Sequence, residues 1–424
     1  MKTHVRNFRN GVTLLLAAAV ILGAPRFPTA ASRRPFPDTS TRITILTDQL
    51  PTTMSDAQMR FAATHYVGTQ KLSLNLSRPI RKVNSAFLVL HYHLAMWQSA
   101  PKVNFIVDGN RWANDFPTVN AHESWFWHNP QGQRVTSKQD GKFLMNISDP
   151  GFRAYWRDSL IAQVRGGDYD GIFFDSASPS LLQWEARAPE DPRLLGRGVR
   201  TNTFPELGGK NWITAWQEWI ADLNRALADK GIPLIPNVGA LTTSWDNSDY
   251  SLTEGVFCEG FLDPTFTMAD WEAAIDQTLS LVARNKIVIL QNYVRSADNL
   301  SKRRYLLANY LLVKGTRTYL SYFASSTLDW YPEWELDFGP AQKTAARASD
   351  LLWNGVYRRD FTKGVVLVNP GTTPVRIALD QPLKRVEPEG GGAVASGGTV
   401  TGRLTTTTVT TLTLGPTSAE ILLR

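Results

Sequence analysis

Short apolar runs alternate with amphipathic stretches along most of this chain. Apolar runs bounded by glycine, proline or polar residues predict strands that are covered on both faces, as in a parallel sheet. We expect eight of them, at residues 43–47, 69–74, 87–93, 171–175, 233–238, 255–259, 287–293 and 318–323. Apolar residues at helical spacing predict intervening helices, the clearest of them at 211–229, 271–282, 300–313 and, closing the series, 340–353.

Eight strands that alternate with helices predict an α/β fold of the (β/α)8 TIM-barrel type, which we place at residues 42–354. The alternation of strands and helices ends after residue 354. Short threonine-rich strands separated by glycine and proline predict a small C-terminal antiparallel β-sandwich domain at residues 355–424.

The first residues have the pattern of a secretory signal peptide, which we place at residues 1–31. A basic start precedes an apolar stretch at 12–22, and Thr29-Ala30-Ala31 offers a small-residue cleavage site. The apolar stretch is short for a membrane span, so we expect a secreted protein, extracellular or periplasmic, without a stable membrane anchor. Residues 32–41 are proline-rich and are expected to be a linker without fixed structure.

The net charge of the chain bears on which partners are expected. The formal net charge of +7 includes four basic residues of the leader, so the mature chain carries +3. The basic run at 302–304 lies in a helical pattern and predicts a solvated face, so nucleic acid is not an expected partner.

The single cysteine, Cys258, excludes an intrachain disulfide. No nucleotide or dinucleotide motif is present, and we expect a monomer without a cofactor.

Two of the predicted strands end in a carboxylate: Asp175 follows the run Gly171–Phe174, and Glu259 follows Gly255–Cys258. The carboxyl ends of barrel strands meet at the face that holds the active site. Two carboxylates can cleave a glycosidic bond, because one protonates the leaving oxygen while the other opposes the oxocarbenium-like carbon. We therefore assign Asp175 as the nucleophile or base and Glu259 as the acid/base; a salt-bridged rim residue is the alternative for either.

His91 and His93 form an HxH motif on the third predicted strand. Imidazoles are common zinc ligands, but a metal site needs further ligands, and the chain has no histidine after His128. We expect no metal. The two histidines are instead expected to bind substrate or orient a carboxylate at the rim, with a core position as the alternative.

Aromatic and polar residues in the predicted rim loops and at strand ends complete the expected site. Fourteen tryptophans are many for this length, and indole faces in rim loops can stack on sugar rings. Asp48 and four other polar residues follow predicted strands or turns, and a turn-forming role is the alternative for Asp108. The residues assigned to substrate binding, besides the two histidines, are Trp97, Asp108, Trp127, Asn237, Asn292, Tyr293 and Trp330.

Four segments resemble the hypothetical glycoside-hydrolase-like family 15: Phe87–Trp97 (FLVLHYHLAMW), Asp170–Ser176 (DGIFFDS), Pro236–Gly239 (PNVG) and Phe257–Phe261 (FCEGF). The arrangement is also distantly similar to the α-galactosidase clan and the endo-α-1,4-polygalactosaminidases. The resemblance implies a barrel with catalytic acids at the ends of strands four and six, which are the positions of Asp175 and Glu259. The α-galactosidase relatives have aspartate, not glutamate, at the second position.

The sequence thus predicts a secreted glycoside hydrolase that cleaves an α-linked poly- or oligosaccharide by a retaining two-carboxylate mechanism. Two alternatives remain open. A non-catalytic carbohydrate-binding protein on a degenerate barrel would bind glycans without cleaving them, and a metal-dependent hydrolase would lose activity with a chelator.

Overall fold

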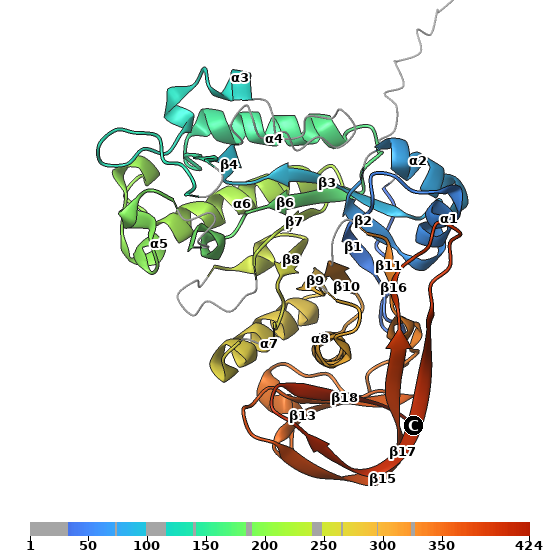
Figure 1. Ribbon diagram of the computed structural model, residues 1–424. Helices are drawn as coiled ribbons and strands as arrows, with labels where there is room; N and C mark the ends of the chain where they lie inside the picture. Colours follow the sequence, from blue (N-terminus) through green and yellow to red (C-terminus); the bar gives the residue numbers. More distant parts are fainter. Residues whose placement is uncertain are drawn as a thin grey trace, which may run out of the picture.

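The computed structural model of the protein has a mixed α/β architecture followed by an antiparallel sheet (Figure 1). It describes residues 33–72, 74–98, 116–138, 141–183, 189–239, 248–263, 266–294, 296–323 and 327–424. The expected signal peptide and Asp108 lie outside these ranges.

Parallel strands form the centre of the fold, in two sheets whose strands follow chain order. The first sheet contains β1 (Leu46–Gln49), β2 (Gly68–Lys71), β3 (Leu88–Leu94), β6 (Gly171–Asp175) and β7 (Leu234–Pro236). The second contains β8 (Gly255–Glu259), β9 (Ile287–Tyr293) and β10 (Thr318–Phe323). Single parallel bridges, Asn237 to Phe257 and Ile45 to Leu320, connect the two sheets. The strand order is therefore the one expected from the sequence.

Helices pack around these strands (Figure 1), and apolar side chains of each main helix belong to the hydrophobic core. They are α1 (Asp56–His65), α2 (Leu74–Val83), α4 (Pro150–Val164), α6 (Trp212–Ala228), α7 (Met268–Ala283) and α8 (Leu300–Val313). Shorter elements occupy the connections: α3 (Phe116–Val119), α5 (Gly198–Thr201), β4 (Trp97–Gln98), β5 (Phe143–Leu144) and 3₁₀ turns at Glu123–Trp125, Pro179–Gln183, Pro192–Leu194, Pro205–Leu207 and Tyr250–Leu252. Within the described ranges, no helix combines the length and apolarity needed to cross a membrane.

Strand alternation divides the core into two layers. Side chains on one face of the strands pack against each other in the centre, among them Leu90 and Tyr92 of β3 and Phe173 of β6. Side chains on the other face pack against the helices, among them Val89 and Phe174. This division decides which residues near the strand ends can reach a common site.

The segment expected to be an unstructured linker is instead packed against the amino-terminal ends of the strands. Phe36 contacts the ring of Tyr319 edge-on at 5.8 Å, and the Tyr319 hydroxyl donates to the Pro37 carbonyl at 2.6 Å. Arg34 pairs with the fully buried Asp170 at 3.1 Å. The expectation was wrong because one aromatic and one charged side chain give this proline-rich segment specific partners.

The closing helix expected at 340–353 is not formed; a 3₁₀ turn at Ala348–Leu351 and a short strand at Leu352–Trp353 lie there instead. An aromatic segment, comprising β11 (Asp329–Trp330) and a 3₁₀ turn at Pro332–Glu335, packs on α1 and α8 instead. Trp330 contacts Phe61 of α1. The apolar surface that a closing helix would cover is therefore already buried.

The C-terminal residues form one antiparallel sheet in the order β12-β13-β14-β18-β15-β17. Its strands are β12 (Leu352–Trp353), β13 (Val356–Asp360), β14 (Gly364–Asn369), β15 (Val375–Gly390), β17 (Gly402–Leu414) and β18 (Ser418–Leu423). Residues 327–424 are all described and contain no second large sheet, so the sandwich expectation was wrong in this respect. The long β15–β17 hairpin bends over its own core and extends to α1 (Figure 1), while the short strand β16 (Gly392–Ala393) pairs with β11.

Candidate active site

Asp175 lies at the carboxyl end of β6 and is held by three hydrogen-bond donors. Its Oδ2 accepts from the Tyr92 hydroxyl at 2.6 Å, and its Oδ1 accepts from Asn237 Nδ2 at 2.9 Å and from the Ser176 backbone N–H at 2.8 Å. Asp175 as a whole is only 6% exposed to solvent. Donors on both oxygens favour the ionised form of a carboxyl group, so this environment suits a carboxylate that stays charged.

The chain turns sharply directly after Asp175. Ser176 has a φ of 54°, a left-handed conformation that is uncommon for a residue with a side chain. The turn brings the Ser176 N–H back onto the carboxylate of the preceding residue. Strained backbone of this kind often occurs at functional sites, and here it fixes the orientation of Asp175.

Glu259 lies at the carboxyl end of β8 and is more exposed than Asp175. Its Oε2 accepts from Asn237 Nδ2 at 2.6 Å, and its Oε1 accepts from the Tyr293 hydroxyl. Both donors come from neighbouring strand ends, Asn237 directly after β7 and Tyr293 at the end of β9. Glu259 is therefore held at the same edge as Asp175 but keeps an accessible side.

Asn237 connects the two carboxylates. The Asn237 Oδ1 accepts from the Gly239 backbone N–H at 3.1 Å, which orients the amide so that Nδ2 faces both acids. Because both hydrogen bonds share Nδ2, Asp175 Oδ1 and Glu259 Oε2 can lie no farther apart than the two distances added, about 5.5 Å. The two carboxylates are therefore close enough to act on the two atoms of a single bond.

A cation lies in the same cluster. Lys71, at the end of β2, pairs with Asp48 at 3.1 Å and lies 5.3 Å from the centre of the Tyr92 ring. Asp48 also accepts from Gln70 at 2.6 Å. Burial alone would lower the pKa of Lys71, but the charges of Asp48, Asp175 and Glu259 raise it above its usual value. The ammonium group is therefore retained and offsets part of the negative charge of the three carboxylates.

The family of this chain follows from its sequence. A family model described as hypothetical glycosyl hydrolase family 15 matches residues 81–365, which include both acids and the residues that hold them. The chain belongs to this family. Membership places it among the glycoside hydrolases and confirms the resemblance drawn from the four short segments.

The comparison with solved structures gives several matches of low similarity. They include a noncanonic maltogenic α-amylase of Thermotoga neapolitana (11% identity, TM-score 0.44, 90% of this chain and 98% of that chain), a family GH13_31 enzyme (11%, 0.47, 90% and 98%) and trehalose-6-phosphate hydrolase of Bacillus licheniformis (9%, 0.45, 91% and 99%). At these values the likeness says nothing about substrate. No curated protein matches the sequence significantly.

In this glycosyl hydrolase family member the two histidines do not reach the site. His91 is 3% exposed, its Nε2 contacts Gln163 Oε1 of α4 at 2.5 Å, and burial lowers its pKa to about 3. His93 is 1% exposed and packs edge-on against Trp156 of α4. The prediction that they lie at the rim was wrong because successive side chains of β3 point to opposite faces of the sheet. Tyr92, which lies between them, points to the acids.

The three tryptophans assigned to sugar binding are buried elsewhere. Trp97 is in the helix-side core, and Trp127 packs against Trp212 and donates to Asp191 at 2.9 Å. Trp330 packs on α1 and donates to Glu335 at 2.8 Å. The expectation that they stack on substrate was wrong, since the loops that carry them fold into the core instead of lining the strand ends.

Strand β9 carries the last two residues that were predicted to bind substrate, Asn292 and Tyr293. Tyr293 reaches Glu259, as expected for a site residue, whereas the neighbouring Asn292 alternates to the helix side and is buried there. Gln291, which was not singled out, shares the face of Tyr293 and is paired in register with Glu259. Its buried Oε1 has no hydrogen-bond partner among the described residues.

The signals for the missed residues were present in the sequence. Tyr92 and Gln291 each lie one position away from a residue that was chosen, and the parity of the neighbouring apolar residues gives their face. Lys71 follows a weak strand pattern with little alternation. Among the described residues, no group of three or more His, Cys, Asp and Glu side chains is arranged to hold a metal ion.

Proposed function

We propose that this glycoside hydrolase cleaves an α-linked poly- or oligosaccharide by a retaining mechanism, with Asp175 as nucleophile and Glu259 as acid/base. The observation that carries the proposal is the shared Nδ2 of Asn237, which keeps one oxygen of each acid within about 5.5 Å of the other. Retaining glycosidases have carboxyl groups about 5–5.5 Å apart, whereas inverting enzymes leave room for a water between more distant groups.

The environments of the two acids support this division of roles. Asp175 is buried and accepts three hydrogen bonds, which suits a group that attacks as a carboxylate. Glu259 is partly exposed, so it can exchange protons with a leaving group and with water. In the first step Glu259 protonates the glycosidic oxygen as Asp175 bonds to the anomeric carbon. In the second step Glu259 takes a proton from water, which attacks the same carbon and releases Asp175.

The preference for an α-linkage rests on the sequence resemblance to the α-galactosidase clan and the polygalactosaminidases. The retaining mechanism is tested by the products. Proton NMR of the first-formed sugar should show the same anomeric configuration as the substrate. Formation of the opposite anomer would overturn the retaining mechanism but leave the two acids in place.

The decisive experiment removes each acid in turn. Asp175→Asn and Glu259→Gln should each lower glycan cleavage, measured as new reducing ends, by at least about a thousandfold while the protein remains folded. Glu254→Gln is the matched control: Glu254 lies at the opposite end of β8 and pairs with the exposed side of Arg317, so activity should stay within about twofold. Glycan binding that survives both substitutions, without cleavage by the wild-type protein, would favour the carbohydrate-binding alternative.

We further propose that the protein is exported and that cleavage follows residue 31. The basic start, the apolar stretch and the small residues at positions 29–31 support this proposal. Amino-terminal sequencing of the protein recovered from the culture medium or periplasm should begin at residue 32. Recovery of an intact leader from the cell interior would overturn it.

A further inference from the structure

The long strand β17 forms one edge of the C-terminal sheet, and this edge is open. On one side β17 pairs with β15, and among the described residues no strand pairs with its other side. In residues 405–411 no backbone N–H or C=O group is hydrogen-bonded to a described residue outside the ladder with β15. In Figure 1 the β15–β17 hairpin runs along the outside of the molecule towards α1. An open edge of this kind can pair with a strand of another chain.

The sequence of β17 does not protect this edge. The eleven residues from Leu404 to Leu414 include no charged residue, no proline and no glycine, and six of the seven residues 405–411 are threonine. Threonine favours extended strands, whereas charges, prolines and bulges are what usually keep an edge from pairing. The one register shift of the hairpin falls in β15, between Ala378 and Leu383, so β17 itself stays regular.

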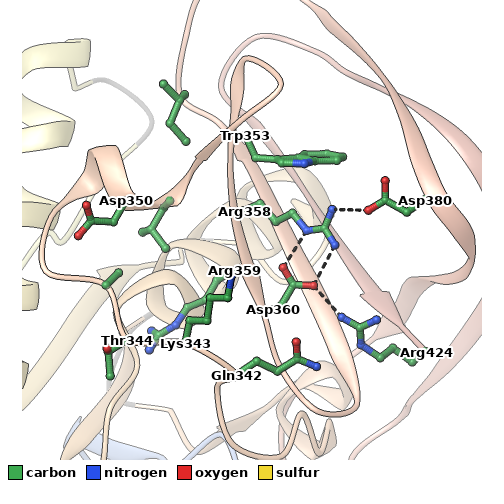
Figure 2. A pocket seen from close by; sticks show the side chains of 13 residues that line it. Gln342, Lys343, Thr344, Asp350, Trp353, Arg358, Arg359, Asp360, Asp380 and Arg424 are labelled. Carbon is green, nitrogen blue, oxygen red and sulfur yellow. Dashed lines mark hydrogen bonds and ion pairs between the residues drawn. The ribbon is translucent and has the colours of Figure 1, made fainter.

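The opposite edge of the sheet is protected, which makes the contrast clear. Strand β12 at that edge has only two residues. Charged groups lie beside it: Arg358 pairs with Asp360 and Asp380, and its guanidinium lies 4.4 Å from the centre of the Trp353 ring (Figure 2). The covered strand β15 likewise carries six charged residues and two prolines. The long edge of β17 therefore differs from every other part of this sheet that could pair with a new strand.

The accessible part of the edge is the threonine-rich segment at 405–411. Thr406, Thr407 and Thr408 are all exposed, as are Thr410 and Thr411. Because successive side chains of a strand point to opposite faces, both faces of β17 are uncovered here. Further along the strand, Leu412 and Leu414 belong to the core of the sheet, so the contact of a new strand would be centred on the threonines.

We propose that a second copy of this chain covers the edge, through antiparallel pairing of the two β17 strands about a two-fold axis at Thr408. In this register Thr406 lies opposite Thr410 of the partner subunit, and Thr405 lies opposite Thr411 of the partner subunit. Cross-strand threonine pairs stabilise antiparallel sheets, and no like charges meet. The seven residues of each strand form roughly six to eight main-chain hydrogen bonds across the axis.

The strand itself favours a second copy over a different protein. The sequence of residues 405–411, TTTTVTT, is nearly the same in both directions, so two antiparallel copies present matching side chains to each other. Pairing joins two six-stranded sheets into one of twelve strands, whose ends are the two short β12 edges. The assembly therefore closes at two copies. The monomer expected from the sequence would instead leave a long, uncharged edge in solvent.

Analytical ultracentrifugation of the purified protein tests the proposal. The wild type should sediment with twice the mass of one chain at about 10 μM and shift reversibly towards one chain on dilution. Thr406→Lys/Thr410→Lys places like charges opposite each other twice and should give a single chain. Thr406→Lys/Thr410→Glu is the matched variant: it changes the same two exposed positions but places opposite charges across the axis, so the dimer should remain. Thr344→Lys, in an exposed loop beside β13 (Figure 2), should also leave the dimer intact.

Several outcomes would overturn the proposal. They are a wild type that stays a single chain up to about 100 μM, a dimer that survives both like charges, loss of the dimer in both double variants, and growth beyond two copies. Hydrogen exchange gives a second readout, because amides of residues 405–411 should be better protected at high than at low protein concentration. Equal exchange at both concentrations would also contradict the pairing. None of these measurements depends on whether Asp175 and Glu259 are catalytic.

Discussion

The Nδ2 atom of Asn237 donates hydrogen bonds to both acids of the strand-end cluster, at 2.9 Å to Asp175 and at 2.6 Å to Glu259. Two carboxylates this close repel each other, and a shared donor between them offsets part of that repulsion. Asn237 is fully buried, and its orientation is fixed by Gly239. Among the described residues that hold the two acids, Asn237 is therefore one that contacts both.

We predict that Asn237→Ala lowers kcat about ten- to a hundredfold, since each lost hydrogen bond to a charged group is worth about 1.5–3 kcal/mol. Asn237→Asp should be worse at neutral pH than at pH 5, because a third carboxylate at this position adds repulsion that protonation relieves. Initial rates across pH 4–8 check both variants. Wild-type activity in Asn237→Ala would show that the acids do not need the shared donor.

Lys71 should offset the repulsion among the acids. The negative charges of Asp48, Asp175 and Glu259 raise the pKa of Lys71, so its ammonium group is the counterion of all three carboxylates and its removal leaves their repulsion uncompensated. For Lys71→Met we expect the acidic limb of the kcat/KM profile to shift upward by about half to one pH unit. Lys71→Arg, which keeps the charge, should leave the limb in place. An unchanged limb in both variants, with a raised KM in Lys71→Met alone, would assign Lys71 to substrate binding only.

The proximity of the two candidate acids could be predicted from the sequence because it depends on two simple regularities. A buried strand gives a continuous apolar run, and a carboxylate that ends such a run lies at the carboxyl edge of the sheet. Asp175 and Glu259 satisfy both, and the structure brings them together through Asn237. The other parallel strands were predicted largely from the same apolar runs, whereas the polar strand β2 shows this pattern only weakly.

The remaining site residues depend on the direction of side chains and on the path of loops. An error of one position in the parity of a strand exchanges Tyr92 for His91 and His93, or Gln291 for Asn292. The tryptophans could not be placed, because an indole suits a core as well as a sugar cleft. The ordered segment around Phe36 and the missing closing helix depend on contacts with distant residues, which a local pattern does not record.

His91 should make the protein sensitive to acid. Its Nε2 is hydrogen-bonded to Gln163 and its buried Nδ1 has no partner among the described residues, so the folded chain holds it neutral, with its pKa lowered by burial to about 3. Between pH 6.5 and 3 the unfolded chain binds a proton that the folded chain does not. The free energy of unfolding should therefore fall with decreasing pH by about 1.4 kcal/mol per unit from this residue.

Urea unfolding at several pH values measures this effect. His91→Leu should be less stable than the wild type at pH 7, and its free energy of unfolding should decrease less steeply between pH 6.5 and 4. His122→Asn, which alters an exposed histidine, is the control and should keep the wild-type slope. Equal slopes for His91→Leu and the wild type would contradict the assignment of a neutral buried imidazole.

Phe36 should stabilise the fold from the side opposite the acids. Its ring contacts Tyr319 and packs on the inner core, so Phe36→Ala should lower the free energy of unfolding by about 1–3 kcal/mol. Because the segment lies at the amino-terminal ends of the strands, KM should not change. Thr41→Ala, an exposed position in the same segment, should stay within about 0.5 kcal/mol of the wild type. Chemical denaturation and initial rates check both expectations. If Phe36→Ala were as stable as Thr41→Ala, the segment would behave as the flexible linker that its composition suggests, and its contacts would add nothing to the stability of the strands.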